Sequence, residues 1–562
     1  MSVYEYNAEA GVYCRSSYSG IGYADGVEAE LYNIVSQVKD RSLLSGEFLP
    51  YMKNWPAEYH FSRKRHLVLR PFAIQPGDRV LELGCGCGAV TRYLAELGAE
   101  VTAVEGELAR ARVAAKRCEG MSNVRFIVDD FLSLELEERF DWVLMIGVFE
   151  YSQKYGRTEN RQAEYLDVVK RHLASDGTMV VAIENKLGLK YLNGAGEDHN
   201  GILYYAPQGL YADRDVTTWG RAELLQRFAA AGFESADLFT AFPDYKLPKV
   251  LFSERIDSER EFRAEELMHY CASLDYRGKN TRNFDESLVL GSLRKNGLIT
   301  DFGNSFVVAL RQGSGFEPES DKSVLAYYYS VDRRSEFCTE TRFSKETRGS
   351  GVIVQKRSLA EDMESGPTDV VFRDSVAQER SVSHVPKTCT DEYISGALMG
   401  YELSKSVLRR DAGSVKQILG QWKDLLSTQY TFYCAITGQP LALSNLENRP
   451  LRDVLIDGGA IDSGPQNIIL SDVPKVFDNE WVSEKPVPFS WVLQRNARLV
   501  SRKRHLGSRA LSAEDIVGYV CSLLGLIASN KDLEEAQFCE RQFQQEIACI
   551  EPSSTVALSF AE

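Results

Sequence analysis

The chain has 562 residues and a formal net charge of −15 at pH 7. This length exceeds what one hydrophobic core usually serves, so two or three domains are expected. The negative charge disfavours nucleic acid as a partner, because its phosphates would be repelled. No apolar run reaches the roughly 18 residues needed to span a bilayer, and no secretory signal starts the chain. The eleven cysteines lack paired CxxC spacing, which is typical of reduced thiols and predicts a cytoplasmic location.

The N-terminal segment shows helical periodicity. Apolar side chains recur at helical spacing over 27–38, so we expect residues 1–55 to form a helical flank or lid. Dense basic runs occur at 63–65 and 502–504. They are interpreted as solvated helix faces rather than polyanion sites.

A glycine turn between two regular elements organises the first half of the chain. Residues 80–83 form a short apolar run, and apolar residues recur at helical spacing over 89–97, which predicts a strand, a turn and a helix. Three glycines would let the backbone come close to a ligand: Gly84, Gly86 and Gly88. Their spacing also fits the dinucleotide fingerprint, so the glycines alone do not identify the ligand.

Acidic residues near the turn favour one ligand. Glu82, at the end of the first strand, would repel a pyrophosphate but attract a ligand amine. Glu105 ends the second strand, where its carboxylate can accept ribose hydroxyls. After a third strand, Asp130 and Phe131 suit an adenine amino group and its ring. Together these residues favour S-adenosylmethionine.

On these residues the chain resembles the class I S-adenosylmethionine-dependent methyltransferases, which have a Rossmann-like α/β fold. A fourth strand over 140–146 ends at Gly147, so the residues after it should floor the active site. The resemblance implies a methyltransferase domain over 56–312. Its expected cofactor-binding residues are Glu82, Gly84, Gly86, Gly88, Glu105, Asp130, Phe131 and Gly147.

A polar, glycine-rich segment over 184–201 follows the fifth strand, where the methyl acceptor should lie. It resembles a loop of bacterial methyltransferases associated with cell-surface polysaccharide and O-antigen synthesis. The resemblance implies O-methylation of a sugar or glycan-related acceptor, with possible glycan assembly enzymes as partners. Candidate bases for the acceptor proton are His199, Asp198 and Glu184. His199 has a reference pKa of about 6.5, nearest to working pH.

The second half of the chain is predicted to be a separate α+β domain. A linker rich in Gly, Ser and charge spans 313–322, the domain spans 323–550, and 551–562 is expected to be a flexible tail. Asp462, Asn467 and Asp478 have the order of a kinase catalytic loop, in which an acid orients a hydroxyl and the other two residues hold magnesium.

This region resembles the C-terminal lobe of kinase-like phosphotransferases, with Lys356 as the phosphate-binding lysine and Mg²⁺/ATP as the implied ligand. It departs from the pattern because no His-Arg precedes Asp462, because Asn479 and Glu480 replace Phe-Gly, and because no glycine-rich nucleotide loop is present. An active lobe and a catalytically dead relic both remain open. The alternatives for the whole chain are therefore a bifunctional methyltransferase/kinase and a non-catalytic scaffold of a polysaccharide assembly complex.

Overall fold

The computed structural model describes residues 3–548 except 17, 19, 23–25, 270, 272, 274, 277–281, 313–320, 347–350, 361–367, 375–376, 386–388 and 502–510. The chain forms two compact units. Unit 1 comprises Met1–Arg260, Tyr270–Val331 and Thr341–Val352, and unit 2 comprises Glu261–His269, Asp332–Glu340 and Ile353–Glu562. Most of the predicted linker and the whole predicted tail lie outside the described residues.

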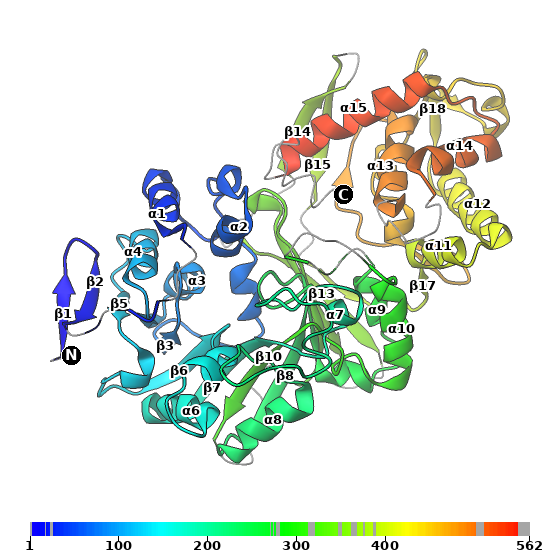
Figure 1. Ribbon diagram of the computed structural model, residues 1–562. Coiled ribbons are helices and arrows are strands. Elements are labelled where there is room, and N and C mark those ends of the chain that lie inside the picture. Colours follow the sequence, from blue (N-terminus) through cyan, green and yellow to red (C-terminus); the bar gives the residue numbers. More distant parts are fainter. Residues whose placement is uncertain are drawn as a thin grey trace. The chain divides into compact units, whose positions relative to one another are not determined.

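Unit 1 is built on one large sheet (Figure 1). Neighbouring strands follow the order β1-β2-β5-β4-β3-β6-β7-β10-β8-β9-β11. The strands from β2 to β7 in this order run parallel, whereas β10 is antiparallel to both of its neighbours. Their bounds are β1 (Tyr4–Asn7), β2 (Val12–Arg15), β3 (Arg79–Leu83), β4 (Glu100–Glu105), β5 (Val124–Val128), β6 (Phe140–Ile146), β7 (Leu173–Glu184), β8 (Ser235–Phe242), β9 (Val250–Ser253), β10 (Ser305–Arg311) and β11 (Val324–Ser330).

The strand order reverses between β3 and β6. The chain adds β4 and β5 on one side of β3, and β6 and β7 on the other. In open α/β sheets, ligands bind beyond the carboxyl ends of the strands at such a switch point. The glycine turn leaves β3 there and Gly147 leaves β6, so the expected Rossmann-like α/β fold is confirmed and the predicted site residues lie at the switch point.

Helices connect the parallel strands, and the apolar faces of these helices pack on the sheet. In α6 the buried residues include Val168 and Val169, and the side chain of Asn160 accepts a hydrogen bond from Ala163 N to cap the helix. The helices of this part are α3 (Ala89–Glu96), α4 (Leu108–Arg117), α5 (Ser152–Tyr155), α6 (Arg161–His172), α7 (Leu189–Leu192), α8 (Arg221–Ala230) and α10 (Glu286–Asn296), with the 3-10 turns η3 (Phe131–Ser133) and η4 (Phe149–Tyr151).

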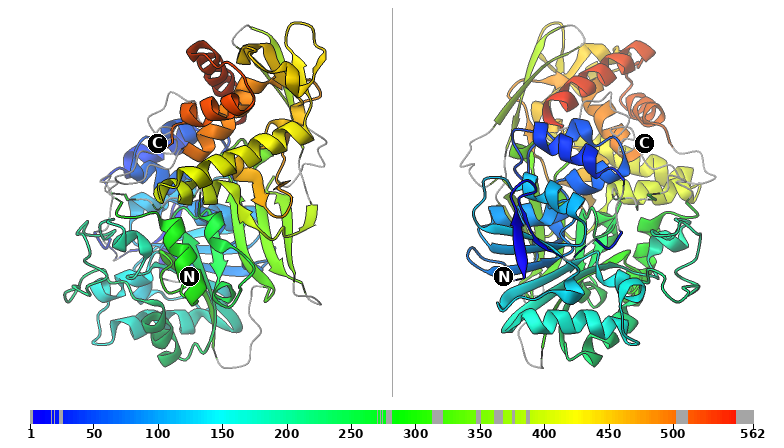
Figure 2. Two further views of the ribbon diagram at one scale, coloured as in Figure 1. Left: turned by 90° about the vertical axis from the view of Figure 1, so that its right-hand side faces the viewer. Right: turned by 60° about the vertical axis from the view of Figure 1, so that its left-hand side comes forward.

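The N-terminal segment is not purely helical. Strands β1 and β2 pair as a hairpin, and β2 joins the sheet beside β5 with Tyr13 opposite Ile127. Helices α1 (Glu28–Gln37) and α2 (Trp55–Phe61) follow, and α1 packs on α4 (Figure 2). Their apolar side chains share a core with Cys87 of the glycine turn. The predicted flank therefore lies against the cofactor side of the domain.

One expectation for this segment was wrong. Arg63, Lys64 and Arg65 are buried, with 6%, 8% and 6% of their surface exposed, so they do not form a solvated face. Arg65 donates to the carbonyl oxygen of Lys246 at 3.0 Å, which fixes it inside the domain. Its charge and length resemble those of a surface residue, and only these tertiary contacts distinguish it. The second basic run, 502–504, lies outside the described residues.

The boundary between the units also differs from the predicted one. Strand β11 belongs to unit 1 because it pairs antiparallel with β9, with Ala326 opposite Phe252. Two strands, β12 (Thr339–Lys345) and β13 (Val352–Ser358), each contain residues of both units. The linker composition at 313–322 therefore does not mark the edge of the first core.

Unit 2 is α+β and has its own core. The largest helices surround buried tryptophans, Trp422, Trp481 and Trp491, and α13, α14 and α15 pack together (Figure 2). Its elements are α9 (Ala264–Leu267), β14 (Thr368–Arg373), β15 (Glu379–His384), β16 (Cys389–Glu392), β17 (Ala397–Leu398), α11 (Met399–Leu408), α12 (Ala412–Gln429), β18 (Phe432–Cys434), β19 (Pro440–Leu441), β20 (Val454–Ile456), β21 (Ile468–Leu470), β22 (Lys475–Val476), β23 (Trp481–Val482), β24 (Val487–Pro488), α13 (Phe489–Ser501), α14 (Ala513–Leu523) and α15 (Asn530–Ile547).

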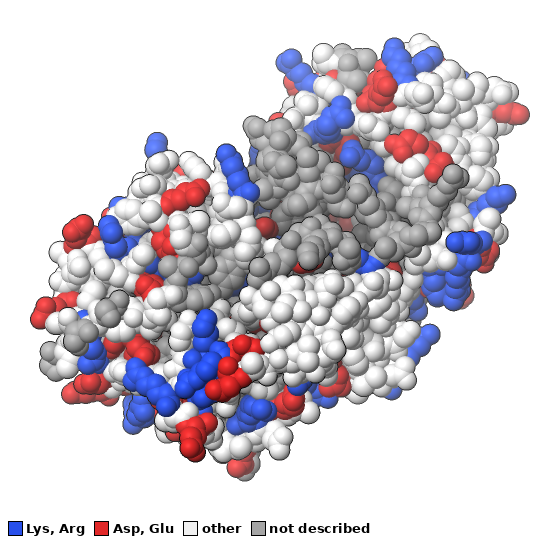
Figure 3. Space-filling view, viewed as in Figure 1, with Lys and Arg blue, Asp and Glu red and all other residues white. Residues whose placement is uncertain are grey.

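The surface carries charges of both signs. On the face shown in Figure 3, acidic and basic side chains are interspersed, although acidic residues exceed basic ones by 80 to 65 in the whole chain. Within the described ranges, no helix is long and apolar enough to cross a membrane.

Candidate active site

The glycine turn between β3 and α3 takes left-handed backbone conformations. Gly84, Gly86 and Gly88 have φ angles of +77°, +55° and +77°, which side chains disfavour. A Cβ on Gly84 would lie 2.6 Å from Val148, and one on Gly88 would lie 2.9 Å from the Ala114 backbone. A Cβ on Gly86 would meet only His60, at 3.8 Å. The free space of this turn is therefore above Gly86, while Gly84 and Gly88 allow the turn to pack.

Glu82 lies buried beside this turn. Its carboxylate accepts a hydrogen bond from Thr91 Oγ1 at 2.6 Å, and no ion pair to it is present among the described residues. Burial raises the pKa of Glu82 to about 8. A buried carboxylate that has only a hydroxyl partner is stabilised by a cation, so Glu82 fits the amino-acid end of S-adenosylmethionine.

Glu105 ends β4 and faces the same turn. Its two oxygens accept hydrogen bonds from Gly86 N at 2.8 Å and Glu107 N at 3.1 Å. Burial raises its pKa above the ordinary value. Because a carboxylate offers about four lone-pair positions, Glu105 can still accept ribose hydroxyls, and its predicted role fits the structure.

The acids after β5 have different partners. Asp129 is buried, and it accepts hydrogen bonds from Tyr4 OH at 2.8 Å and Arg15 Nε at 2.9 Å. Asp130 caps η3 by accepting from Leu132 N at 3.0 Å, and it also pairs with Arg157. Its predicted contact with adenine remains a prediction, and an adenine amino group would have to compete with Arg157.

An aromatic pair follows these acids. The Phe131 ring packs edge-on against Tyr165, with ring centroids 4.9 Å apart. Because Phe131 leaves β5 beside the switch point, its predicted stacking on adenine is compatible with this position.

Gly147 connects the cofactor side to the acceptor side. Its φ angle is +74°, and a Cβ there would lie 2.6 Å from Tyr245 OH. This glycine thus lets Tyr245 reach the carboxyl end of β6. Tyr245 OH in turn lies 3.4 Å from Glu150 Oε1 and 3.5 Å from Glu184 Oε1.

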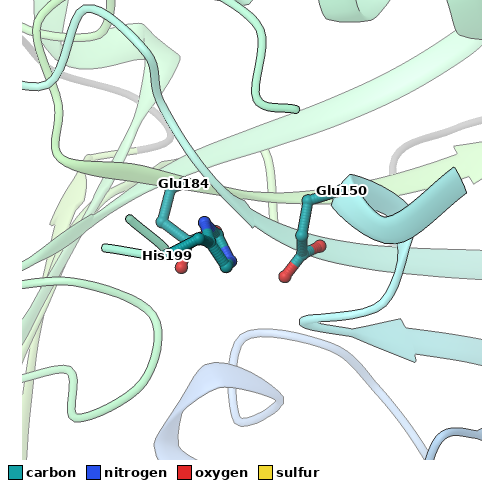
Figure 4. A group of neighbouring side chains, drawn as sticks. All are labelled: Glu150, Glu184 and His199. Atoms are coloured by element: carbon teal, nitrogen blue, oxygen red, sulfur yellow. The ribbon is translucent and has the colours of Figure 1, made fainter. Parts of the chain in front are cut away.

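Three side chains converge beyond the ends of β6 and β7. Figure 4 shows Glu150 from η4, Glu184 from the last position of β7, and His199 from the polar loop pointing toward one another. One ligand atom from each lies within 4.8 Å of the others. Both glutamates are buried. The predicted acceptor segment therefore does place Glu184 and His199 together.

His199 is oriented by the loop itself. Its Nδ1 donates to Glu197 Oε1 at 2.9 Å, because an ionised carboxylate can only accept. Burial lowers the pKa of His199, but the bond to Glu197 and the charges of Glu184 and Glu150 outweigh burial and raise it to about 8. The pKa of His199 therefore lies above its reference value of about 6.5.

Asp198 points into a separate group of charges. Its Oδ2 lies 2.9 Å from Lys190 Nζ and 2.6 Å from Lys246 Nζ. Lys190 also lies 3.4 Å from Asp244, which accepts a hydrogen bond from Tyr276. Burial would raise the pKa of Asp198, but the two lysines hold it well below its usual range. Asp198 is therefore a weak base, and the structure corrects its candidacy.

Several residues of this site were not predicted from the sequence. Glu150 lies in the stretch expected to floor the site, but a single glutamate after a strand gave no reason to choose it. Tyr245 and Lys246 lie just beyond the end of β8. A conspicuous signal was the short polar run Asp244-Tyr-Lys246 directly after an apolar strand.

In unit 2, the kinase-like residues lie together but are fully engaged. Asp462 Oδ2 accepts from the backbone N–H groups of Glu480 and Trp481 at 3.1 and 3.0 Å, and its Oδ1 lies 3.2 Å from Arg495. Asn467 Nδ2 donates to the carbonyl oxygen of Asp462 at 3.0 Å. The base role of Asp462 remains a prediction that these contacts do not favour.

The predicted phosphate-binding lysine is also paired. Lys356 forms ion pairs with Asp478 and Glu480, and Glu480 pairs with Arg333 as well. Asn467 Nδ2 lies 3.5 Å from the carbonyl oxygen of Asp478, so the two predicted magnesium ligands are close. Their binding of Mg²⁺ with ATP remains a prediction.

Comparison with known proteins finds a match around the first of these sites. Residues 80–177 match the family model for a methyltransferase domain. The match begins in β3 and includes the glycine turn, Glu105, Asp130 and Gly147. The chain therefore carries a methyltransferase domain, as the resemblance implied.

Curated relatives are similar over the same region. The chain is 28% identical over 119 residues to the cyclopropane-fatty-acyl-phospholipid synthase of Escherichia coli (strain K12), which covers 21% of this chain and 29% of the relative. It is 31% identical over 114 residues to the malonyl-[acyl-carrier protein] O-methyltransferase of Bacillus anthracis, covering 20% of this chain and 39% of the relative. The chain thus spans well under half of these relatives.

The solved structures to which the chain is similar include the phosphoethanolamine N-methyltransferase 2 of Haemonchus contortus in complex with phosphomonomethylethanolamine and S-adenosylhomocysteine. It is 20% identical to this chain with a TM-score of 0.27, covering 45% of this chain and 53% of the other. The two curated relatives are named for different substrates, so the acceptor of this chain has to be argued from its own residues.

Proposed function

We propose that the chain is an S-adenosylmethionine-dependent methyltransferase that methylates a hydroxyl of a sugar or glycan-related acceptor. The observation that carries the proposal is the juxtaposition of Glu82 and the glycine turn with the Glu150, Glu184 and His199 group, at the carboxyl ends of adjacent strands. The first part suits a cationic cofactor and the second suits a polar acceptor with a proton to lose.

The residues of the site supply alignment and a proton acceptor. S-adenosylmethionine, when bound, supplies a sulfonium methyl group, which the acceptor oxygen takes as the carbon–sulfur bond breaks. Glu82 would hold the amino-acid end and Glu105 the ribose. His199 Nε2 would take the acceptor proton, while Glu197 stabilises the resulting imidazolium through Nδ1. Since this proton transfer needs neutral His199, we expect activity to rise with pH toward about 8.

The side chains on the acceptor side of the sheet favour a polyhydroxyl acceptor. Charged and aromatic side chains with hydrogen-bonding groups gather there: Glu184, Lys190, Asp198, Asp244, Tyr245, Lys246 and Tyr276. Most of these groups pair with one another, but Glu150 and Glu184 each keep a buried carboxylate oxygen with no partner among the described residues. Such oxygens can accept hydrogen bonds from acceptor hydroxyls. The resemblance of residues 184–201 to polysaccharide-associated methyltransferases points to the same acceptor class.

A direct test measures methyl transfer to glycans. Full-length protein with labelled S-adenosylmethionine and a panel of nucleotide sugars and oligosaccharides should produce a labelled glycan and S-adenosylhomocysteine. His199→Ala should lower kcat by roughly 10²- to 10⁴-fold and leave cofactor affinity unchanged, whereas Gln208→Ala, an exposed change in the same loop, should have no effect. Absence of S-adenosylmethionine binding in calorimetry would instead favour the non-catalytic scaffold.

A further inference from the structure

Glu150 and Glu184 each have one carboxylate oxygen that is engaged and one that is not. Tyr245 OH lies 3.4 Å from Glu150 Oε1 and 3.5 Å from Glu184 Oε1, and Lys246 forms an ion pair with Glu184 Oε1. The Oε2 atoms of both glutamates are buried and have no hydrogen-bond partner in the part of the chain that the structure describes. Because a buried carboxylate oxygen without a donor is costly, we expect a ligand to supply the donor.

The two carboxylates lie close to each other. One oxygen of Glu150 lies within 4.8 Å of one oxygen of Glu184, and the side chains point toward one another beyond the ends of β6 and β7 (Figure 4). The exposed fractions of Glu150 and Glu184 are 1% and 0%. Two N–H bonds of a tetrahedral ammonium group diverge by about 109°, so oxygens about 2.9 Å from its nitrogen lie about 4.7 Å apart. The spacing of the two glutamates therefore suits one ammonium group.

The charges around the two glutamates also favour a cationic ligand. Among the described residues, five carboxylates gather here with three side chains that can carry a positive charge: Glu150, Glu184, Glu197, Asp198 and Asp244 with Lys190, Lys246 and His199. Each lysine pairs with two of these carboxylates, and neither forms an ion pair with Glu150 within the described ranges. A cation bound at Glu150 would offset the excess of negative charge where little water can enter.

We propose that Glu150 and Glu184 bind a primary ammonium group of the acceptor, beside the hydroxyl that is methylated. An ammonium group offers three N–H donors and a positive charge, so it can make charge-assisted hydrogen bonds to both carboxylates. A hydroxyl or an N-acetyl amide brings one donor and no charge. Resting on the proposed function, this inference narrows the acceptor to an amino sugar, in which an ammonium group and a hydroxyl lie on neighbouring carbons.

The ammonium group is held and does not react. Its nitrogen has no lone pair, so it cannot attack the sulfonium methyl group, and the hydroxyl oxygen remains the nucleophile. The new carbon–oxygen bond forms as the carbon–sulfur bond breaks, and the hydroxyl proton passes to the base of the proposed function. A positive charge beside the hydroxyl also favours the loss of that proton. Glu150 and Glu184 thus determine which acceptor is bound and leave proton removal to His199.

The test compares acceptors that differ in this one group. Full-length protein with labelled S-adenosylmethionine is given tetrasaccharides of glucosamine, N-acetylglucosamine and glucose that share one linkage. We expect kcat/KM for the glucosamine tetrasaccharide to exceed that for the other two by roughly tenfold or more, with the methyl group on oxygen in the product. Glu150→Gln and Glu184→Gln should remove this preference by raising KM for the glucosamine tetrasaccharide.

Glu150→Gln is the more informative variant, because Glu184→Gln also loses the ion pair with Lys246. Thermal unfolding verifies the fold of both variants, and calorimetry should show unchanged S-adenosylmethionine affinity. Glu159→Gln, at an exposed position, serves as the matched control and should keep the wild-type preference. Calorimetry with ethanolamine, in the presence of S-adenosylhomocysteine, measures binding of an ammonium group without methyl transfer.

Three results would overturn the proposal: equal kcat/KM for the glucosamine and glucose tetrasaccharides, a methyl group on nitrogen in the product, or a preference that a folded Glu150→Gln variant retains. Equal transfer to the three tetrasaccharides would leave the proposed function standing and remove the ammonium site. Transfer to none of them, together with ethanolamine binding that Glu150→Gln abolishes, would refute the sugar acceptor and leave the ammonium site standing. Neither transfer nor ethanolamine binding would refute both.

Discussion

The chain has two buried clusters of acidic and basic side chains, one around Asp462 and Glu480 and one around Glu150 and Glu184. They differ in how many of their carboxylate oxygens have hydrogen-bond or ion-pair partners. In unit 2, Asp462 and Glu480 have both carboxylate oxygens occupied by backbone N–H groups, arginines or a lysine. In unit 1, Glu150 and Glu184 each keep a buried oxygen that has no partner in the part of the chain that the structure describes. Saturated acids can stabilise a fold without a ligand, whereas bare buried acids indicate that a ligand belongs beside them.

The pKa values reflect the same contrast. Burial opposes ionisation of Glu480, but Arg333 and Lys356 outweigh it and lower the pKa well below the ordinary value. Burial and the charge of Glu184 raise the pKa of Glu150 to about 8. Arg333 and Lys356 therefore hold Glu480 ionised. Glu150 has no such partner among the described residues, so its ionised form would be stabilised by an added cation.

The largest expected effect is on the stability of unit 2. Glu480→Ala leaves Lys356 and Arg333 without their shared partner, so it should lower the free energy of unfolding by about 3–5 kcal/mol. Denaturant unfolding, monitored by the hydrogen exchange of backbone amides in unit 2, would measure the loss of unfolding free energy. Glu150→Gln alters a carboxyl group that has no ion pair among the described residues and whose pKa burial raises to about 8, so it should change stability little. Equal losses of unfolding free energy in the two variants would contradict the difference inferred between the two clusters.

Cofactor binding should depend on Glu82. Glu82→Ala removes the partner of the cationic end and should weaken S-adenosylmethionine binding by about 2–3 kcal/mol, roughly 30- to 150-fold. Calorimetry on the full chain measures this change, and thermal unfolding verifies the fold. Glu137→Ala, at an exposed position, serves as the matched control. Wild-type affinity in a folded Glu82→Ala protein would remove Glu82 from the cofactor site.

The raised pKa of Glu82 predicts pH-dependent binding. Since its pKa is about 8 in the free protein, a cationic ligand must displace a proton below that pH. S-adenosylmethionine affinity should therefore rise with pH by up to about tenfold per unit between pH 5.5 and 7. The charges of Arg65 and Glu105 also shift the pKa of Glu82. The Glu82→Gln variant therefore shows how much of the pH dependence comes from Glu82. A slope that persists in Glu82→Gln would assign it to another group.

The smallest expected effect concerns nucleotide binding in unit 2. Because Lys356, Asp478 and Glu480 already neutralise one another, magnesium and ATP should leave the melting temperature of the full chain unchanged. A scanning-fluorimetry titration with MgATP tests this. A concentration-dependent rise that Asp478→Asn abolishes would show a working site and restore the bifunctional alternative.

The sequence alone determined the local architecture of the methyltransferase domain. A change from an apolar run to helical spacing across three glycines identified the strand, turn and helix, and the acids ending the next strands marked the cofactor side. These signals are local, because glycine conformation and apolar periodicity depend on neighbouring residues. Glu184 and His199 were also predicted as site residues. A residue that follows a parallel strand lies at the carboxyl end of the sheet, and this position can be read from the sequence.

Tertiary structure decided which of these groups have partners. The burial of Arg63, Lys64 and Arg65, the pairing of Asp198 with two lysines, and the bare oxygen of Glu150 all depend on segments distant in sequence. The same holds for Asp462, whose spacing suggested a catalytic acid and whose carboxylate contacts Arg495 and two backbone N–H groups. A carboxylate's role follows from its desolvation and its neighbours' charges, and only the folded chain sets either one.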